Sequence, residues 1–154
     1  MKGPHVMCGD TTPTRSAELV QPAEAAYVGA ARHFTSELLG LWGLAAEDRI
    51  AAELIVDELA ANAARHGRAQ MSIRLCMHDD GLVITVTDSG EARHHDGASP
   101  DSTPPDEHGR GLEIVRRLAG STCIHDDERG RRVVTTRRLA PLQRSVAGVT
   151  SPAS

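Results

Sequence analysis

Residues 58–67 read E-L-A-A-N-A-A-R-H-G, and the interpretation of the whole chain depends on this stretch. It ends a run from about Ala45 to His66 in which apolar residues lie on most sides of the predicted helix. This helix is therefore expected to be largely buried. Glu58 and Asn62 are four residues apart, so their side chains lie about 6 Å apart on one face of that helix. Burying a carboxylate or a carboxamide without partners costs a few kcal/mol. The two residues are therefore either a polar pair facing solvent beside Arg65 or part of a functional site.

The rest of the chain supplies a sheet and further helices around this helix. Ser16–Val20 is predicted as a short strand, and an amphipathic helix is predicted to begin at Pro22 and to end near residues 40–43. Alternating residues predict a strand at 69–78, and after a turn at Asp79-Asp80-Gly81 residues 82–87 return as its hairpin partner. A helix is predicted at 109–119, and strands at 121–125 and 132–139 form a last hairpin. The predicted fold class is α+β, a two-layer sandwich with helices on one face of a mostly antiparallel sheet.

Length and composition predict one folded domain. The chain has 154 residues, of which 40% are hydrophobic and 25% charged, and this composition argues against disorder of the whole chain. The predicted organisation is a flexible arm at 1–15, a domain at 16–140 and a flexible tail at 141–154. Seventeen basic and 21 acidic residues give a net charge of −4, which argues against direct binding of nucleic acid.

The cysteines and the start of the chain indicate the compartment. Cys8, Cys76 and Cys123 are widely spaced and form no C-x-x-C pair, so neither a disulfide framework nor a zinc site is predicted. The first 15 residues lack the apolar core of a signal peptide, and no stretch approaches the roughly 20 apolar residues that cross a bilayer. The expected location is the cytoplasm, without a membrane partner.

Two glycine-containing segments follow the helix. Asp88-Ser89-Gly90 ends the predicted strand at 82–87, where it forms either an ordinary turn or a place for a flat ligand beside a carboxylate. His108-Gly109-Arg110-Gly111-Leu112 leads from a long loop into a helix, where the glycines are either hinges or a cradle for phosphate at the helix N-terminus. The loop at 91–108 is long enough to favour a functional role.

The order of these three segments resembles the Bergerat-type, or GHKL, ATP-binding fold shared by gyrase, histidine-kinase catalytic domains and anti-sigma-factor serine kinases. The stretch at 58–67 matches the family's N box, Asp88 and Gly90 match its first glycine box, and Gly109 and Gly111 match its second. The resemblance covers roughly residues 17–139. The chain looks most like the small anti-sigma regulatory ATPases of actinobacteria.

The resemblance implies a role for each matched residue. Asn62 would give its side-chain oxygen to Mg²⁺, a cation that prefers hard oxygen ligands. Asp88 would accept a hydrogen bond from the adenine amino group, and Gly90 would give the base room. Glu58 would take the proton from the attacking hydroxyl during phosphoryl transfer.

The second glycine box is expected to hold the phosphates. Gly109, Arg110 and Gly111 would wrap them, and Arg110 or His108 would reach the terminal phosphate. His66 is either a nucleotide contact or only a cap at the end of its helix. The candidates for binding the nucleotide and its metal are Asn62, His66, Asp88, Gly90, His108, Gly109, Arg110, Gly111 and Leu112.

The chain departs from the family pattern in three places. The first glycine box reads D-S-G-E-A and lacks a second glycine. Val134 aligns best where many relatives have a threonine near the adenine. Thr135 and Thr136 follow directly, and a shift of one residue would change which side chain faces the base, so the role is not assigned to one residue. The last predicted strand carries four arginines, at 131, 132, 137 and 138, which form either a solvated face or a docking surface for an acidic protein.

The loop has two further features. As a lid, residues 91–107 should become ordered over bound nucleotide, with the side chains of Asp96, Asp101, Asp106 and Glu107 pointing outward. His94, His95 and Asp96 form a weaker candidate for a transition-metal site.

The leading functional hypothesis is an anti-sigma factor that binds ATP and Mg²⁺ and phosphorylates a serine of a small anti-anti-sigma protein of the STAS type. Its partners would be that protein and a sigma factor, and the resemblance also implies a homodimer. One alternative is a regulatory module that binds ATP or proteins without transferring phosphate. Another is a detached histidine-kinase-like catalytic domain.

Overall fold

Alternating side chains build one antiparallel sheet in the computed structural model, which describes residues 12–66, 68–92 and 105–140. The strands of this described part are β1 (Arg15–Pro22), β2 (Arg68–Met77), β3 (Gly81–Ala92), β4 (Ser121–Asp127) and β5 (Gly130–Arg138). They are arranged in the order β1-β2-β3-β5-β4, and every neighbouring pair is antiparallel. The predicted α+β class is therefore confirmed.

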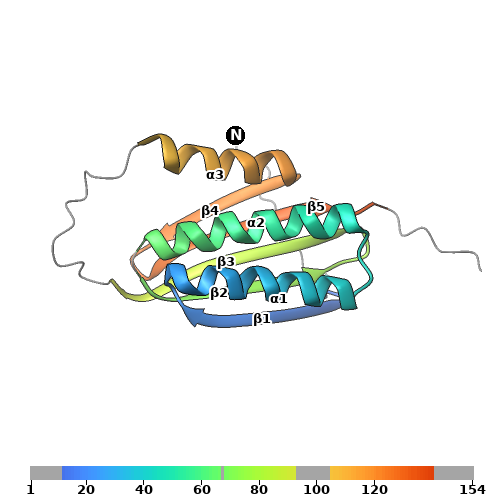
Figure 1. Cartoon of the computed structure of the whole chain (residues 1–154), viewed down its shortest axis with the longest axis horizontal. Coiled ribbons are helices and arrows are strands. Elements are labelled where there is room, and N and C mark those ends of the chain that lie inside the picture. Colours follow the sequence, from blue (N-terminus) through green and yellow to red (C-terminus); the bar gives the residue numbers. More distant parts are fainter. Residues whose placement is uncertain (1–11, 67, 93–104, 141–154) are drawn as a thin grey trace, which may run out of the picture.

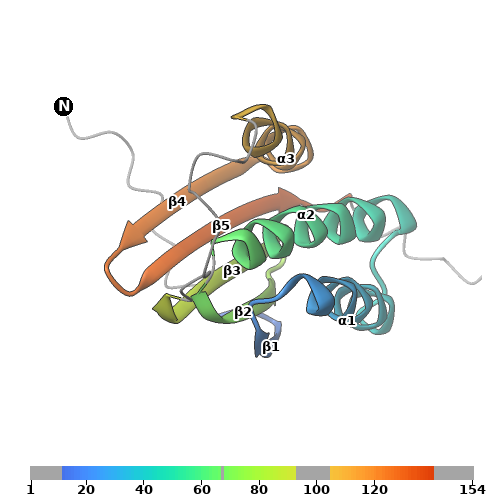
Figure 2. The same ribbon diagram turned by 60° about the vertical axis from the view of Figure 1, so that its left-hand side comes forward.

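The helices of the described residues lie together on one face of the sheet (Figure 1 and Figure 2). They are a 3₁₀ turn at Ala25–Tyr27, α1 (Val28–Leu41), α2 (Ala46–Arg65) and α3 (Pro105–Leu118). The 20 residues of α2 span about 30 Å. This helix packs against α1 on one side and α3 on the other, which makes it the centre of the helical layer.

The core lies between α2 and the central strands. Every second residue of β2 and β3 is buried against the helices, and these are Met71, Ile73, Leu75, Leu82, Ile84 and Val86. From α2 the fully buried side chains Ile55 and Val56 meet them. Burying an aliphatic side chain of this size contributes about 1.5–3 kcal/mol, so this interface fixes the place of α2 over the sheet.

A buried ion pair fastens the start of α2 to β5. Asp48 is only 3% exposed, and its Oδ1 accepts a hydrogen bond from Nε of Arg137 at 3.1 Å and lies 3.0 Å from Nη2 of the same guanidinium. Its Oδ2 accepts the main-chain N–H of Ala140 at 3.0 Å, and Arg137 Nη1 donates to the carbonyl of Leu118 at 2.6 Å. The pair therefore joins α2, β5 and the end of α3.

The arginines of β5 alternate between the two faces of the sheet. Arg131 and Arg137 are half-buried on the helical side, whereas Arg132 and Arg138 are exposed on the other. The basic strand is thus not one continuous solvated or docking face, because half of its charges are used inside the fold.

The two helices beside α2 begin at other residues than predicted. Pro22 is the last residue of β1, and α1 begins only at Val28, after the 3₁₀ turn. The prediction of a helix start at Pro22 is wrong because proline also suits an edge strand. Helix α3 begins at Pro105, four residues before the predicted Gly109. Proline in the first turn, followed by Asp106 and Glu107, is itself a helix-start signal.

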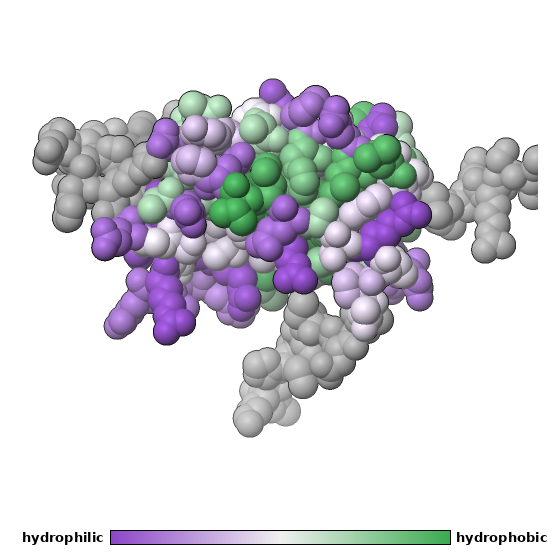
Figure 3. Space-filling model, turned by 90° about the horizontal axis from the view of Figure 1, so that it is seen from below, coloured by the Kyte–Doolittle hydropathy of each residue, from purple (hydrophilic) through white to green (hydrophobic). Residues whose placement is uncertain are grey.

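The predicted terminal segments lie mostly outside the described residues, although Arg15 is already the first residue of β1. On the surface seen in Figure 3, hydrophobic side chains form a patch bordered by hydrophilic ones. Large exposed apolar side chains include Val20 of β1 and Leu41 of α1. Within the described ranges, no helix has both the length and the apolar character needed to cross a membrane.

Candidate functional site

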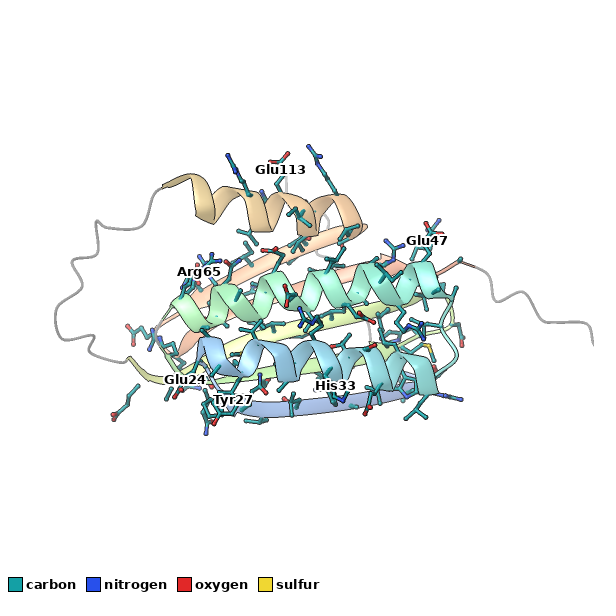
Figure 4. The ribbon with its side chains drawn as sticks, in the orientation of Figure 1. Glu24, Tyr27, His33, Glu47, Arg65 and Glu113 are labelled. Atoms are coloured by element: carbon teal, nitrogen blue, oxygen red, sulfur yellow. The ribbon has the colours of Figure 1, made fainter. Side chains whose placement is uncertain are left out.

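The last turns of α2 carry the first group of predicted site residues. Asn62 is buried, with 9% of its surface exposed, and Glu58 is half-buried one turn earlier. Arg65 marks this end of α2 in Figure 4, and its Nη1 donates to Asn62 Oδ1 at 3.2 Å. The pair is therefore not a solvated surface pair, because the side chain of Asn62 points into the protein.

Gly111 of α3 lies directly against both of these side chains. A Cβ built on Gly111 would lie 2.5 Å from Glu58 Oε2 and 4.0 Å from Asn62 Nδ2. A methyl group at residue 111 would therefore displace the Glu58 carboxylate, and glycine lets the two segments lie in direct contact. The fold thus brings the second glycine segment onto the helical stretch that precedes it by about 50 residues.

Asp88 lies in β3 just beyond the ladder that joins β3 to β5. The last pair of that ladder is Thr87 with Arg132, and Asp88 itself is 3% exposed. Its Oδ1 accepts the main-chain N–H of Arg131 at 2.8 Å, so the carboxylate takes the place of a main-chain acceptor where the strands separate. A Cβ on Gly130 would lie 1.9 Å from the carbonyl oxygen of Asp88, which leaves room only for glycine at that position.

A small pocket connects these features. It is lined by Leu59, Asn62, Ala63, Val86, Asp88, Leu112, Arg131 and Val133. Its volume of about 10 Å³ is close to what a single water molecule needs. A ligand the size of a nucleotide enters only if a wall moves, and Leu112 on α3 provides one of those walls.

Arg131 forms a charged cluster at this pocket. Its Nε and Nη2 donate to the two carboxylate oxygens of Asp126 at 2.8 and 3.2 Å, and its Nη1 lies 3.1 Å from His66 Nε2. The hydrogen bond from Arg131 lowers the pKa of the Asp126 carboxyl, and Asp126 in turn raises the pKa of Arg131. His66 ends α2 as its C-cap residue, with its N–H bonded to the carbonyl of Asn62 at 3.1 Å.

Gly90 lies beside the pocket without lining it. Its φ is +93°, and a Cβ there would lie 3.0 Å from the Cβ of Ala69. The carbonyl of Gly90 accepts a hydrogen bond from Arg68 Nη1 at 3.2 Å. Both the backbone conformation and the close neighbour favour glycine at this position.

The remaining predicted residues are described only in part. His108 and Gly109 belong to α3, but their surroundings lie outside the described residues. Arg110 is exposed. The predicted lid, including the candidate metal site at His94, His95 and Asp96, also falls largely outside the described ranges. Within those ranges no group of three or more histidine, cysteine or acidic side chains could hold a metal ion.

One assignment from the sequence is corrected. Val133, which is 6% exposed, lines the pocket, whereas Val134 pairs with Thr85 on the opposite face of the sheet. The shift of one residue along β5 changes the face, because side chains alternate along a strand. Sequence reasoning also missed Arg131 as part of the site, since the four arginines of β5 look alike until their faces are known.

A larger cavity in the described part of the chain lies elsewhere. Its volume is about 240 Å³, and its lining includes Trp42, Asp48, Met77 and Leu139. Asp48 precedes Asn62 by 14 residues on α2, or about 21 Å along the helix axis. None of the predicted site residues lines this cavity, so size alone does not identify the site.

Comparisons with known proteins identify the family and support the fold. The sequence model of the family described as histidine kinase-like ATPase domain matches residues 21–137. No curated protein matches the sequence. Among 22 matching chains of solved structures is the crystal structure of the RsbU and RsbW domains of Rv1364c from Mycobacterium tuberculosis, with a TM-score of 0.64 and 20% identity. The match covers 82% of this chain and 32% of that one, so this chain spans about a third of that chain's length. At this identity the likeness shows a shared fold.

Proposed function

The chain belongs to the histidine kinase-like ATPase domain family, and on that premise we propose that it is an anti-sigma factor with serine-kinase activity. It would bind ATP with Mg²⁺ and transfer the terminal phosphoryl group to a serine of a small anti-anti-sigma protein of the STAS type. The observation that carries the proposal is the meeting of Asn62, Asp88 and Leu112 around one pocket, although they come from three separate segments.

The residues at the end of α2 fit a metal-assisted transfer. Asn62 offers a carboxamide oxygen, a hard donor of the kind that Mg²⁺ prefers, and its present partner is the exposed Arg65. Mg²⁺, when bound, would offset the negative charge of the phosphates. Glu58 is the proposed general base. It would accept the serine proton as the serine oxygen bonds to the terminal phosphorus and the bond from that phosphorus to the ADP oxygen breaks.

The base and the phosphates would be held by the other two segments. Asp88 would accept a hydrogen bond from the adenine amino group, and Gly90 would leave space near the base. Residues 109–111 lie inside α3, which begins at Pro105, so their N–H groups would hold the phosphates only after the first turns of α3 unwind, with Arg110 or His108 near the terminal phosphate. Because the pocket has room for only about one water molecule, the start of α3 would have to move away from Glu58 to admit ATP.

The partners follow from the family resemblance. An RsbW domain in the solved relative supports a regulatory role by protein contact, and the net charge of −4 agrees with protein partners rather than nucleic acid. We further propose a cytoplasmic protein that forms a homodimer. Light scattering at several concentrations would test the dimer, and a constant monomer mass would contradict it.

Nucleotide binding is tested by thermal unfolding in millimolar ATP with and without Mg²⁺. A ligand that binds only the native state raises the melting temperature, so we expect a shift with wild type. Asp88→Asn should reduce it, because one acceptor becomes a donor facing the adenine amine. No shift for wild type in any nucleotide would contradict the ATP-binding proposal.

Catalysis is tested by pairing nucleotide calorimetry with transfer of labelled phosphate to the cognate small protein. Glu58→Ala should leave ATP affinity within a few fold and lower transfer by about 10²–10⁴, the usual contribution of a general base. Asn62→Ala should impair Mg²⁺-dependent binding and transfer together. Glu47→Ala, at the opposite and exposed end of α2, is the matched control (Figure 4).

Two results would change the assignment. Wild-type transfer rates in Glu58→Ala would remove Glu58 from the mechanism. ATP binding by wild type without transfer to any captured partner would favour the non-catalytic regulatory module.

A further inference from the structure

The carboxylate of Asp88 is held from one side only. Its Oδ1 accepts the N–H of Arg131, and among the described residues no hydrogen bond is made to its Oδ2. Gly130 packs on the carbonyl of Asp88, so the main chain at 130–131 cannot move without disturbing it. One oxygen of a buried carboxylate is thus occupied by the protein, while the other remains for a ligand.

The side chain of Arg131 fixes that main chain in place. The guanidinium forms a two-point ion pair with Asp126, its cross-strand neighbour on β4, and contacts His66 at the end of α2. A planar guanidinium bonded at both ends of its fork has little freedom to rotate. Arg131 therefore joins β4, β5 and α2 around the carboxylate, and only 29% of its side chain is exposed.

The number of Asp88 carboxylate oxygens that can accept a hydrogen bond from the ligand affects whether the pocket prefers adenine or guanine. Adenine offers its 6-amino group as donor, which one oxygen can accept. Guanine has a carbonyl oxygen at that position, and its 2-amino group and ring N–H form an adjacent donor pair that suits both oxygens of a carboxylate. Occupying Oδ1 from within the protein leaves the single acceptor that favours adenine.

We infer that Arg131 is the positioning residue that sets the base specificity of this pocket: its main-chain N–H holds Oδ1 of Asp88, and its side chain keeps that N–H in place through Asp126 and His66. The inference rests on the proposed nucleotide-binding function. It assigns Arg131 no contact with the phosphates and no part in phosphoryl transfer.

The test measures the dissociation constants of ATP and GTP, each with Mg²⁺, by calorimetry on the full chain. Arg131→Ala should lower the preference for ATP over GTP by about tenfold, the worth of one hydrogen bond to a charged group. Arg132→Ala is the matched control, because Arg132 is the next residue of β5 but is exposed on the other face. It should leave the preference within twofold of wild type.

A second variant tests the same inference in case Arg131→Ala does not fold. Asp126→Ala removes the ion-pair partner of Arg131. The side chain of Asp126 is 60% exposed, so the variant should still fold. It should also lower the preference for ATP over GTP, as Arg131→Ala does. An amide resonance of Arg131 that moves upfield in Asp88→Asn would show the hydrogen bond without any nucleotide.

The outcomes separate the two proposals. If wild type binds ATP and folded Arg131→Ala and Asp126→Ala keep its preference within twofold, the inference about Arg131 is wrong and the proposed function stands. If wild type binds neither nucleotide, both are wrong.

Discussion

Replacing Gly130 with alanine should destabilise the protein far more than an average glycine substitution. The added Cβ would lie 1.9 Å from the carbonyl oxygen of Asp88 and 3.1 Å from its Oδ1. The nearest obstacle is main chain inside β3, so it cannot turn aside as a flexible side chain would. Reaching ordinary contact at 3.4 Å requires the two strands to separate by about 1.5 Å.

The expected loss can be estimated from two effects. Overpacking of this kind costs about 1–3 kcal/mol, and a φ of +152° costs a non-glycine residue about 1–3 kcal/mol more. Together they lower the free energy of unfolding by about 2–6 kcal/mol. At about 3 °C per kcal/mol for a domain of this size, that corresponds to a fall in melting temperature of roughly 6–18 °C.

Thermal and urea unfolding followed by circular dichroism would measure the change. Gly29→Ala is the control, since a Cβ there has nothing within 4 Å and the residue lies in the first turn of α1. Alanine should stabilise that helix by up to about 1 kcal/mol. A melting temperature of Gly130→Ala within 2 °C of wild type, as a rough criterion, would refute the close packing of Gly130 on Asp88.

Three further predictions concern the ion pairs and the contact between α3 and α2. Asp48→Ala should lower the free energy of unfolding by about 3–5 kcal/mol in urea titrations, because it leaves the buried charge of Arg137 without its partner; a loss below about 1 kcal/mol would contradict this. Gly111→Ala should change stability little, since the flexible end of Glu58 can move away, yet it should reduce phosphoryl transfer by displacing that carboxylate; an unchanged transfer rate would count against the assignment. The neighbouring arginine holds the pKa of Asp126 below its ordinary value of 3.8, so the ion pair stabilises the fold fully above that value and loses this contribution as the pH falls through the lower folded-state pKa. In Asp126→Asn, the drop in melting temperature between about pH 7 and pH 3 should be smaller than in wild type, and an equal drop would argue against the pair.

The sequence predicts the layers of this fold well because both layers have strong periodic signals. Alternation in β2 and β3 gives their buried faces directly, and α2 is recognised from an apolar run that ends in an arginine, a histidine and a glycine. The ends of elements are less certain, since proline suits an edge strand as well as a first helical turn. This ambiguity explains the misplaced starts of α1 and α3.

The candidate site, like the fold, could be predicted from the sequence only in its local features. The spacing of Glu58 and Asn62 on one helix face is a local property, which the sequence contains. The packing of Gly111 on Glu58 and the hydrogen bond from Arg131 to Asp88 are contacts over 43 residues or more, which no local pattern specifies. The difference between Val133 and Val134 depends on the register of β5, and only the paired strands determine it.

The length of α2 has a consequence for measurement. Trp42, the only tryptophan of the chain, lines the cavity near the start of this helix, about 20 Å from the pocket at its other end. A nucleotide in that pocket would not touch the indole ring. A change in tryptophan fluorescence on adding nucleotide would therefore be an optical sign of movement transmitted through the helical layer, and it could be recorded without attaching any label.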